Sequence, residues 1–247
     1  MRDHRDCTPG ARRAWIPLAA LALAAAGLPG GAGAQTRPLN DTGQTQCFDA
    51  SNASVACNAA ISGLPGQDGR YGRDAAAAAG VLVKQGAGSA GFDFTRLCMN
   101  GQAAGAGTCP ANPSYNTGAN PTATEWACTR DNVTGLVWSL QTRLEFWDTA
   151  ITPAFAATGH NAISRCGSAT GWRLPTNAEL LTLATYGGSN PAIDSSHFPD
   201  TADFPYWTST PGTASNTAWA VDFATGGNNL YNTLGATYVR LVLPSGL

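Results

Sequence analysis

The residues best suited to chemistry are grouped in a polar segment between residues 190 and 205. Asp194, Asp200 and Asp203 are carboxylates of the kind that hold a metal ion or act as a pair in glycoside hydrolysis. His197 follows two serines in the same segment, and these are the residue types of a serine hydrolase. The sequence contains no Gly-x-Ser-x-Gly motif. The loop 194–203 therefore predicts either a hydrolytic or metal site or, as the alternative, a solvated acidic loop.

Further aspartates lie in a glycine- and asparagine-rich region near the N-terminus. They are Asp41, Asp49, Asp68 and Asp74. Aspartates in such surroundings are typical of turns and, where several carboxylates converge, of calcium loops. Their spacing does not match an EF-hand. Calcium thus stays an alternative to plain turns, and the sequence indicates no other cofactor.

For ligand recognition, the sequence favours a glycine- and asparagine-rich turn near the C-terminus. This turn predicts a hairpin whose exposed tip carries Asn228, Asn229 and Tyr231. Amide and aromatic side chains together provide adaptable hydrogen bonding and stacking. Arg173 is a further candidate, as a contact for an anionic ligand. The alternative for Arg173 is a structural role, in which its guanidinium pairs with a carboxylate such as Glu179.

Residues 1–34 have the pattern of an export signal. A basic start precedes an apolar run from Trp15 to Leu28, and Ala32-Gly33-Ala34 forms a small-residue cleavage site. Arg12-Arg13 leaves a twin-arginine route as an alternative. Cleavage there leaves a net charge of −4 and a single lysine, Lys84. This balance disfavours nucleic acid and anionic membranes as partners, since both need clustered positive charge. We expect the mature chain in the periplasm, at the cell surface or in the medium.

The cysteines predict disulfide bonds. Six remain after the signal is removed, and an even number in an exported chain favours disulfides over metal or redox chemistry. No two cysteines have the spacing of a zinc knuckle or a thioredoxin-type site. Their order in the chain suggests three local pairs: Cys47 with Cys57, Cys98 with Cys109, and Cys128 with Cys166.

The stretch from Trp172 to Leu181 predicts an abrupt change from extended chain to helix. Pro175 keeps the residue before it out of helical dihedral angles. Thr176 and Glu179 have the spacing of a capping box, in which each side chain binds the other's backbone N–H. The helix is expected to end near Tyr186, before a pair of glycines.

The C-terminal half predicts antiparallel strands at residues 134–140, 206–210, 217–223 and 237–243. Tryptophans on these strands or at their ends are expected to be core residues rather than sugar platforms, because each buries a large apolar area: Trp138, Trp172, Trp207 and Trp219. Arg240 is expected to be a structural guanidinium, with an anion contact as the alternative. Helices followed by antiparallel strands indicate an α+β fold.

Residues 35–124 predict a loop-rich leader, because they contain few large apolar side chains. We expect the first two disulfides to pin this leader and a short helix to form at Arg73–Ala79. Residues 125–247 then form the folded domain.

Five motifs in this order resemble the Lcl C-terminal domain family, named for the C-terminal domain of a collagen-like bacterial adhesin. They are Thr134-Gly135-Leu136-Val137-Trp138, Cys166, Trp172-Arg173-Leu174-Pro175-Thr176 with Glu179-Leu180, Tyr206-Trp207-Thr208-Ser209-Thr210, and Tyr238-Val239-Arg240. The resemblance covers about residues 125–243. It implies a domain similar to the C-type-lectin-like fold, with irregular antiparallel sheets and two helices. It also implies binding of sulfated glycans, although the acidic mature chain lacks the overall positive charge that such binding favours.

These observations lead to one main hypothesis and two alternatives. The main hypothesis is an exported, non-catalytic module for recognition or adhesion that binds an extracytoplasmic glycan or protein. The first alternative is a structural component of a surface appendage or envelope complex. The second is a hydrolase that uses the loop 194–203. An enzyme of the formylglycine-generating type is disfavoured, because no cysteine follows Cys166.

Overall fold

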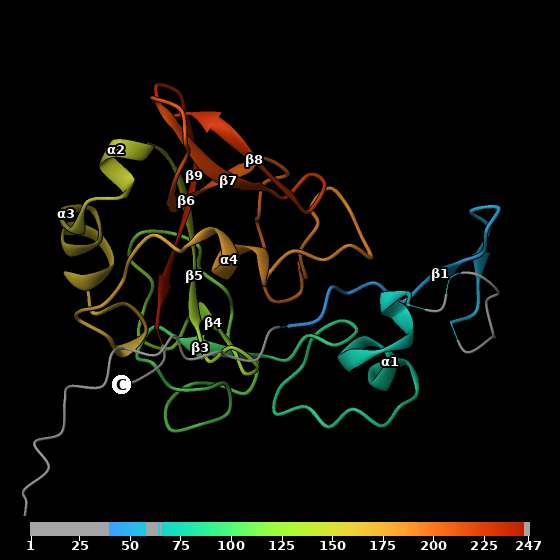
Figure 1. The fold of residues 1–247 in the computed structure, drawn as a ribbon. Helices are drawn as coiled ribbons and strands as arrows, with labels where there is room; N and C mark the ends of the chain where they lie inside the picture. The colour runs from blue at the N-terminus through green and yellow to red at the C-terminus, as the bar shows by residue number, and fades with distance from the viewer. Residues whose placement is uncertain (1–39, 58–63, 65, 245–247) are drawn as a thin grey trace, which may run out of the picture. The chain divides into compact units, whose positions relative to one another are not determined.

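A seven-stranded sheet forms the framework of the protein (Figure 1). The computed structural model describes residues 40–57, 64 and 66–244, and the predicted export signal lies outside these ranges. The strands lie in the order β3 (Phe94–Cys98), β4 (Trp126–Asp131), β5 (Val137–Phe146), β9 (Ala236–Leu243), β6 (Pro205–Pro211), β7 (Thr217–Asp222) and β8 (Gly227–Asn232). Neighbouring strands are antiparallel except β6 and β9, which are parallel. The α+β class is confirmed, with a mixed rather than purely antiparallel sheet.

The strand β9 is buried on both faces of the sheet. Val239 and Leu241 belong to a core cluster with Trp207, whereas Val242 belongs to a second cluster with Trp138. Because side chains alternate along a strand, the two clusters cover opposite faces. Three of the four tryptophans expected in the core are at most 3 % exposed: Trp138, Trp172 and Trp207. The expectation is wrong for Trp219 on β7, which is only half-buried, because the alternate residues Ala218 and Ala220 face the first core cluster.

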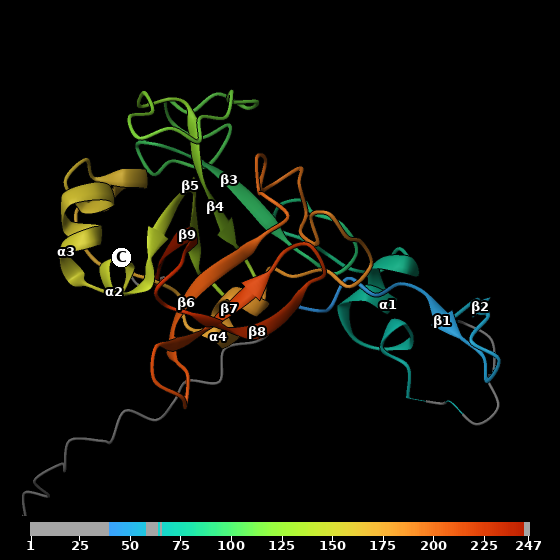
Figure 2. The same cartoon turned by 90° about the horizontal axis from the view of Figure 1, so that it is seen from above.

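Short helices follow β5 and lie beside β5 and β9 in both views (Figure 2). They are α2 (Trp147–Ala150), α3 (Pro153–Ala156) and the π-helical turn η2 (Ala157–Asn161). Pro153 starts α3, where its missing N–H is tolerated, and the side chain of Thr152 caps the helix. None of the helices in the described ranges has the length and hydropathy needed to cross a bilayer.

The predicted capping box forms at the start of α4 (Asn177–Leu181). The Oγ1 atom of Thr176 accepts from the N–H of Glu179 at 3.2 Å, and Glu179 accepts from the N–H of Thr176 at 2.8 Å. The expected end near Tyr186 is wrong. After Leu181 the backbone tightens into successive i→i+3 hydrogen bonds, and the hydroxyl of Thr182 binds the carbonyl of Glu179 at 2.6 Å.

The N-terminal segment contains a small hairpin and a helix. The hairpin pairs β1 (Cys47–Phe48) with β2 (Ser54–Val55). After the 3₁₀ turn η1 (Asp68–Arg70), helix α1 (Gly72–Ala78) occupies the region where a short helix was expected. The predicted disulfides are confirmed: Cys47–Cys57, Cys98–Cys109 and Cys128–Cys166. This segment also supplies β3, an edge strand of the sheet.

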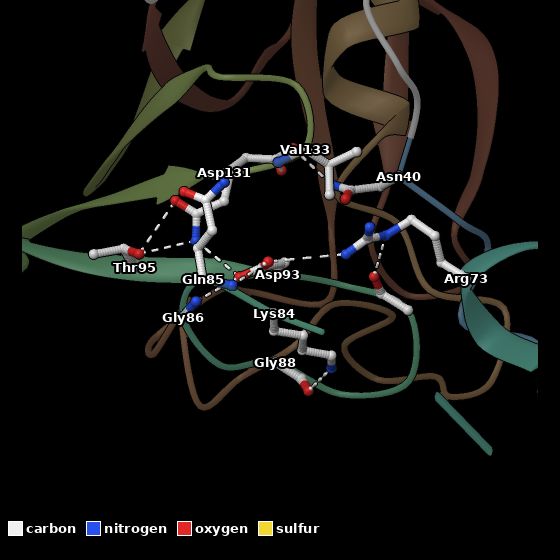
Figure 3. Close-up of polar contacts among 12 residues, drawn as sticks. Asn40, Arg73, Lys84, Gln85, Gly86, Gly88, Asp93, Thr95, Asp131 and Val133 are labelled. Atoms are coloured by element: carbon white, nitrogen blue, oxygen red, sulfur yellow. Dashed lines mark hydrogen bonds and ion pairs between the residues drawn. The ribbon is translucent and has the colours of Figure 1, made fainter. Parts of the chain in front are cut away.

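Buried polar contacts tie the N-terminal segment to the sheet (Figure 3). Asp93 accepts from the Nδ2 atom of Asn132 at 2.8 Å and lies 3.9 Å from Arg73. Burial alone would raise the pKa of Asp93, but these partners and two backbone N–H groups hold it below its usual value. Asn40 donates to the Oδ2 atom of the buried Asp131 at 2.6 Å. The chain before β3 is therefore hydrogen-bonded to β4 and the turn that follows it.

Candidate functional site

His197, Ser196 and Asp194 do not form the triad of a serine hydrolase. The Nδ1 atom of His197 lies 3.3 Å from Asp194 Oδ2 and 3.0 Å from Ser196 Oγ. In a serine hydrolase the nucleophile and the orienting carboxylate contact different nitrogens of the imidazole ring. Here both groups contact the same nitrogen, so the ring cannot take a proton from the serine while the carboxylate orients it.

Asp194 instead anchors two loops. Its Oδ2 atom accepts from the N–H of Ser89 at 2.9 Å, and its Oδ1 atom accepts from the N–H of Ser196 at 3.0 Å. Burial alone would raise the pKa of Asp194, but hydrogen bonds from His197, the hydroxyl of Ser196 and the N–H of Ser89 hold it far below its usual range. Asp200 and Asp203 are exposed, and within the described residues neither forms a carboxylate cluster with Asp194.

The recognition residues expected at a hairpin tip lie along the edge strand β8. Asn228 and Asn229 are exposed there. Tyr231 is half-buried, with its ring edge-on to Trp207 at 6.5 Å and its hydroxyl 3.4 Å from Asp222 Oδ2. Burial and the nearby Asp222 raise the pKa of Tyr231. The tip placement is wrong because β8 already begins at residue 227, and the tyrosine faces the sheet.

The two motif arginines have internal partners. Arg173 forms a two-point contact with Glu179, with nitrogen–oxygen distances of 2.8 and 2.6 Å. This is the structural alternative considered from the sequence. Arg240 is fully buried, and its guanidinium donates to the carbonyl of Ser139 at 2.6 Å and to the hydroxyl of Thr201 at 2.8 Å. Both guanidinium groups therefore have partners within the chain, although the side chain of Arg173 is also 40 % exposed.

Three of the four N-terminal aspartates come together. Asp41, Asp68 and Asp74 each place a carboxylate oxygen within 4.8 Å of those of the others. Asp49 does not join them and instead closes its own turn through backbone N–H groups.

A pocket of about 190 Å³ opens between β5, β9 and the α3–η2 segment. Its polar and aromatic lining comes from Asn120, Gln141, Arg143, Phe155, Thr158 and His160. Gln141 and Arg143 stand two residues apart on β5, and the same-face periodicity of a strand directs them to one side. The described residues that line the pocket include no carboxylate.

His160 is held as a neutral, fixed wall of this pocket. Its Nε2 atom lies 2.7 Å from the Oγ atom of Ser139, and its ring packs edge-on to Trp172 at 5.1 Å. Burial lowers the pKa of His160 to about 3, and the charges of Arg165 and Arg143 add to this effect. The imidazole therefore stays neutral at physiological pH.

Two arginines lie at this pocket, and one of them is in an ion pair. The guanidinium of Arg143 lies 4.0 Å from the ring centre of Phe155 and 3.3 Å from Glu145. Arg165 is fully buried behind the lining, where its Nη2 atom donates to the carbonyl of Ala119 and the side chain of Gln141. Its Nε and Nη1 atoms have no hydrogen-bond partner among the described residues. Burial lowers the pKa of Arg165 only to about 10, so the charge remains.

Local sequence patterns did not predict this pocket. Its residues come from a loop, two strands and a helical segment, and no local motif joins them. One signal was available. Arg165 directly precedes Cys166, so the third predicted disulfide places its backbone near the core, although this does not predict a buried guanidinium.

The C-terminal part of the chain matches a known family. Residues 127–243 match the family model described as the Lcl C-terminal domain. The matched range contains every strand of the seven-stranded sheet except β3, together with the pocket residues on β5, β9 and η2. A search of curated proteins finds no match to this chain.

Proposed function

We propose that this chain, whose residues 127–243 belong to the Lcl C-terminal domain family, is an exported, non-catalytic recognition module. The family is associated with adhesins, which supports a role at a surface. The three disulfides support export, because such bonds persist in oxidising compartments. The contacts of His197 support a non-catalytic role, since serine and carboxylate share one ring nitrogen.

The pocket beside Arg143 is the observation that carries the proposal. Its guanidinium, amide and aromatic lining supplies the donors and apolar faces that sites for polar ligands use. Arg165 adds a buried positive charge without a carboxylate partner among the described residues. We infer that the ligand is a glycan with a carboxylate or sulfate group, which the pocket receives. The net negative charge of the chain does not oppose this, because local charge at a pocket determines the contact.

Glycan-array binding with the secreted chain tests this assignment. We expect acidic glycans to bind and neutral ones of the same size to bind weakly. Replacing Arg143 with alanine removes a charge-assisted contact and is expected to weaken binding about tenfold or more. Asn229→Ala on the distant edge strand β8 is the matched control and should bind as the wild type does. Loss of binding in Asn229→Ala, with Arg143→Ala unaffected, would move the site to β8.

The finer architecture is also part of the proposal. We infer a signal peptide at residues 1–34, a leader at 35–124 and the family domain at 125–247, with a likeness to the C-type-lectin-like fold. The pairing of β3 with β4 implies that the leader completes the sheet of the domain. In this arrangement recognition uses side chains that the sheet and the α3–η2 segment hold in place.

The edge strand β8 favours a second candidate function, assembly into a surface appendage or envelope complex. Among the described strands, β8 pairs only with β7, so its outer edge offers free backbone groups. Leu230 and Leu234 near this edge are 39 % and 68 % exposed. Such an edge suits the addition of a strand from another chain. Concentration-dependent self-association, abolished by Asn228→Pro, would favour this candidate over a soluble glycan ligand, because the N–H of Asn228 faces away from β7.

A further inference from the structure

Three carboxylates converge beside the start of helix α1. Asp68 opens the 3₁₀ turn η1, and Asp74 lies in the first turn of α1. Asp41 reaches them from the extended chain, and its Oδ2 atom accepts from the N–H of Asp74 at 2.8 Å. One oxygen from each of the three carboxylates lies within 4.8 Å of the others.

The burial of Asp74 gives a separate indication of a ligand. This residue is fully buried, and its Oδ1 atom accepts from the N–H of Gly91 at 2.6 Å. The N–H of Gly43 lies near this carboxylate, but no described donor is in hydrogen-bonding geometry with its buried Oδ2 atom. Burial raises the pKa of Asp74, and the charges of Asp41 and Asp68 contribute further. A buried acceptor without a donor is unfavourable unless another group satisfies it.

No described lysine or arginine forms an ion pair with these carboxylates. Arg73 precedes Asp74 in the chain, and its side chain extends toward Asp93 (Figure 3). Its Nε atom donates to the carbonyl of Gly91 at 2.7 Å, and its Nη2 atom lies 3.9 Å from Asp93. The guanidinium of Arg73 is therefore engaged with Gly91 and Asp93 and does not pair with the three carboxylates.

We propose that Asp41, Asp68 and Asp74 bind a divalent cation and that this cation is calcium. Calcium accepts six to eight oxygen ligands at about 2.3–2.6 Å, so ligand oxygens on one ion lie up to about 5 Å apart, which the cluster satisfies. Magnesium requires a tighter octahedron and usually takes only one or two carboxylates. Water completes the coordination. The ion supplies the positive charge that the three carboxylates lack and a partner for the orphaned oxygen.

The bound ion would fasten the N-terminal segment to the sheet. Asp41 follows Asn40, which donates to Asp131 at the end of β4 at 2.6 Å. The next residue, Thr42, accepts from the N–H of Tyr186 at 2.8 Å. Calcium would thus join η1 and α1 to a stretch of chain that is already hydrogen-bonded to the folded domain. This role is independent of the pocket beside Arg143.

Calorimetric titration and thermal unfolding of the secreted, chelator-treated chain test this proposal. Calcium sites in extracellular modules have Kd values of about 10⁻⁴–10⁻³ M. At about ten times Kd, we expect calcium to raise Tm by about 3–6 °C. Asp68→Asn is the main variant, because Asp68 is exposed and its replacement should leave the fold intact. Asp203→Asn, an exposed carboxylate away from the cluster, is the matched control.

Support requires calcium binding in the wild type and in Asp203→Asn, with a loss of at least about tenfold in affinity in Asp68→Asn. A folded Asp74→Asn variant that does not respond to calcium would place the ion at the buried carboxylate. An undiminished calcium response in Asp68→Asn would overturn the proposed site. An equal response of the wild type to magnesium would overturn the assignment to calcium.

Discussion

Replacing His160 with glutamine is expected to remove a pH-dependent part of the stability. The pKa of His160 falls from 6.5 to about 3 on folding, chiefly because the imidazole is buried. A histidine whose pKa is depressed in the folded state contributes stability above its unfolded pKa. That contribution is lost as pH falls toward about 3, since only the unfolded chain takes up the proton. Linkage gives about 1.4 kcal/mol per pH unit below the unfolded pKa, or about 2 kcal/mol between about pH 7.5 and pH 5.

Denaturant unfolding of the wild type and of His160→Gln at several pH values in this window measures the effect. Glutamine retains a polar group that can contact Ser139, while it loses the ring contact with Trp172. We expect the variant to be less stable at neutral pH, but its free energy of unfolding should change by about 2 kcal/mol less across the window. His197 and the carboxylates are present in both proteins, so their contributions cancel. Parallel pH profiles for the two proteins would refute the argument that His160 is buried in the neutral form.

Two further predictions concern stability. Replacing Cys128 and Cys166 by alanine should cost about 3.9 kcal/mol, against about 2.8 kcal/mol for Cys98 and Cys109, because the bonds span 38 and 11 residues. Both cysteine pairs are buried, so the two replacements disturb the core in a similar way. Equal losses of unfolding free energy at equilibrium would therefore contradict loop closure as the source of the difference. Thr176→Ala removes the cap acceptor of α4 and should cost about 1 kcal/mol. An unchanged Tm in that variant would show that the capping box does not stabilise the helix.

The features that the sequence predicted depend on local or alternating patterns. The capping box at Thr176 and Glu179 needs only residues three apart, and strands such as β7 follow from alternation. The strand order does not follow from such patterns. Phe94–Cys98 lies in a glycine-rich stretch, and its place in the sheet depends on distant β4, with which it pairs. The length of α4 was also predicted wrongly. The residues after Leu181, including the buried Leu183, form tight i→i+3 turns instead of continuing the helix.

The candidate sites also divide into features that local sequence patterns predict and features that depend on distant parts of the chain. The disulfide pairs followed from cysteine order, whereas the pocket brings Gln141, Phe155 and His160 together from three elements. Tyr231 shows how a small shift in a hairpin changes the interpretation of a residue. Its register opposite Ala218 turns the ring toward the core, although composition alone suggested exposure. A one-residue change in register reverses the face of a strand residue, and sequence composition does not specify the register.

The arginines near the pocket and His160 keep the same protonation state over a wide pH range. Ser139 links two of the relevant elements, because its carbonyl accepts from Arg240 on β9 and its hydroxyl contacts His160 on η2. This holds the imidazole close to Arg165 and Arg143, whose charges oppose its protonation. The guanidinium groups stay protonated and the histidine stays neutral between about pH 5 and pH 8. The charge of the pocket therefore does not change in that interval, and any pH dependence of binding there must come from the ligand.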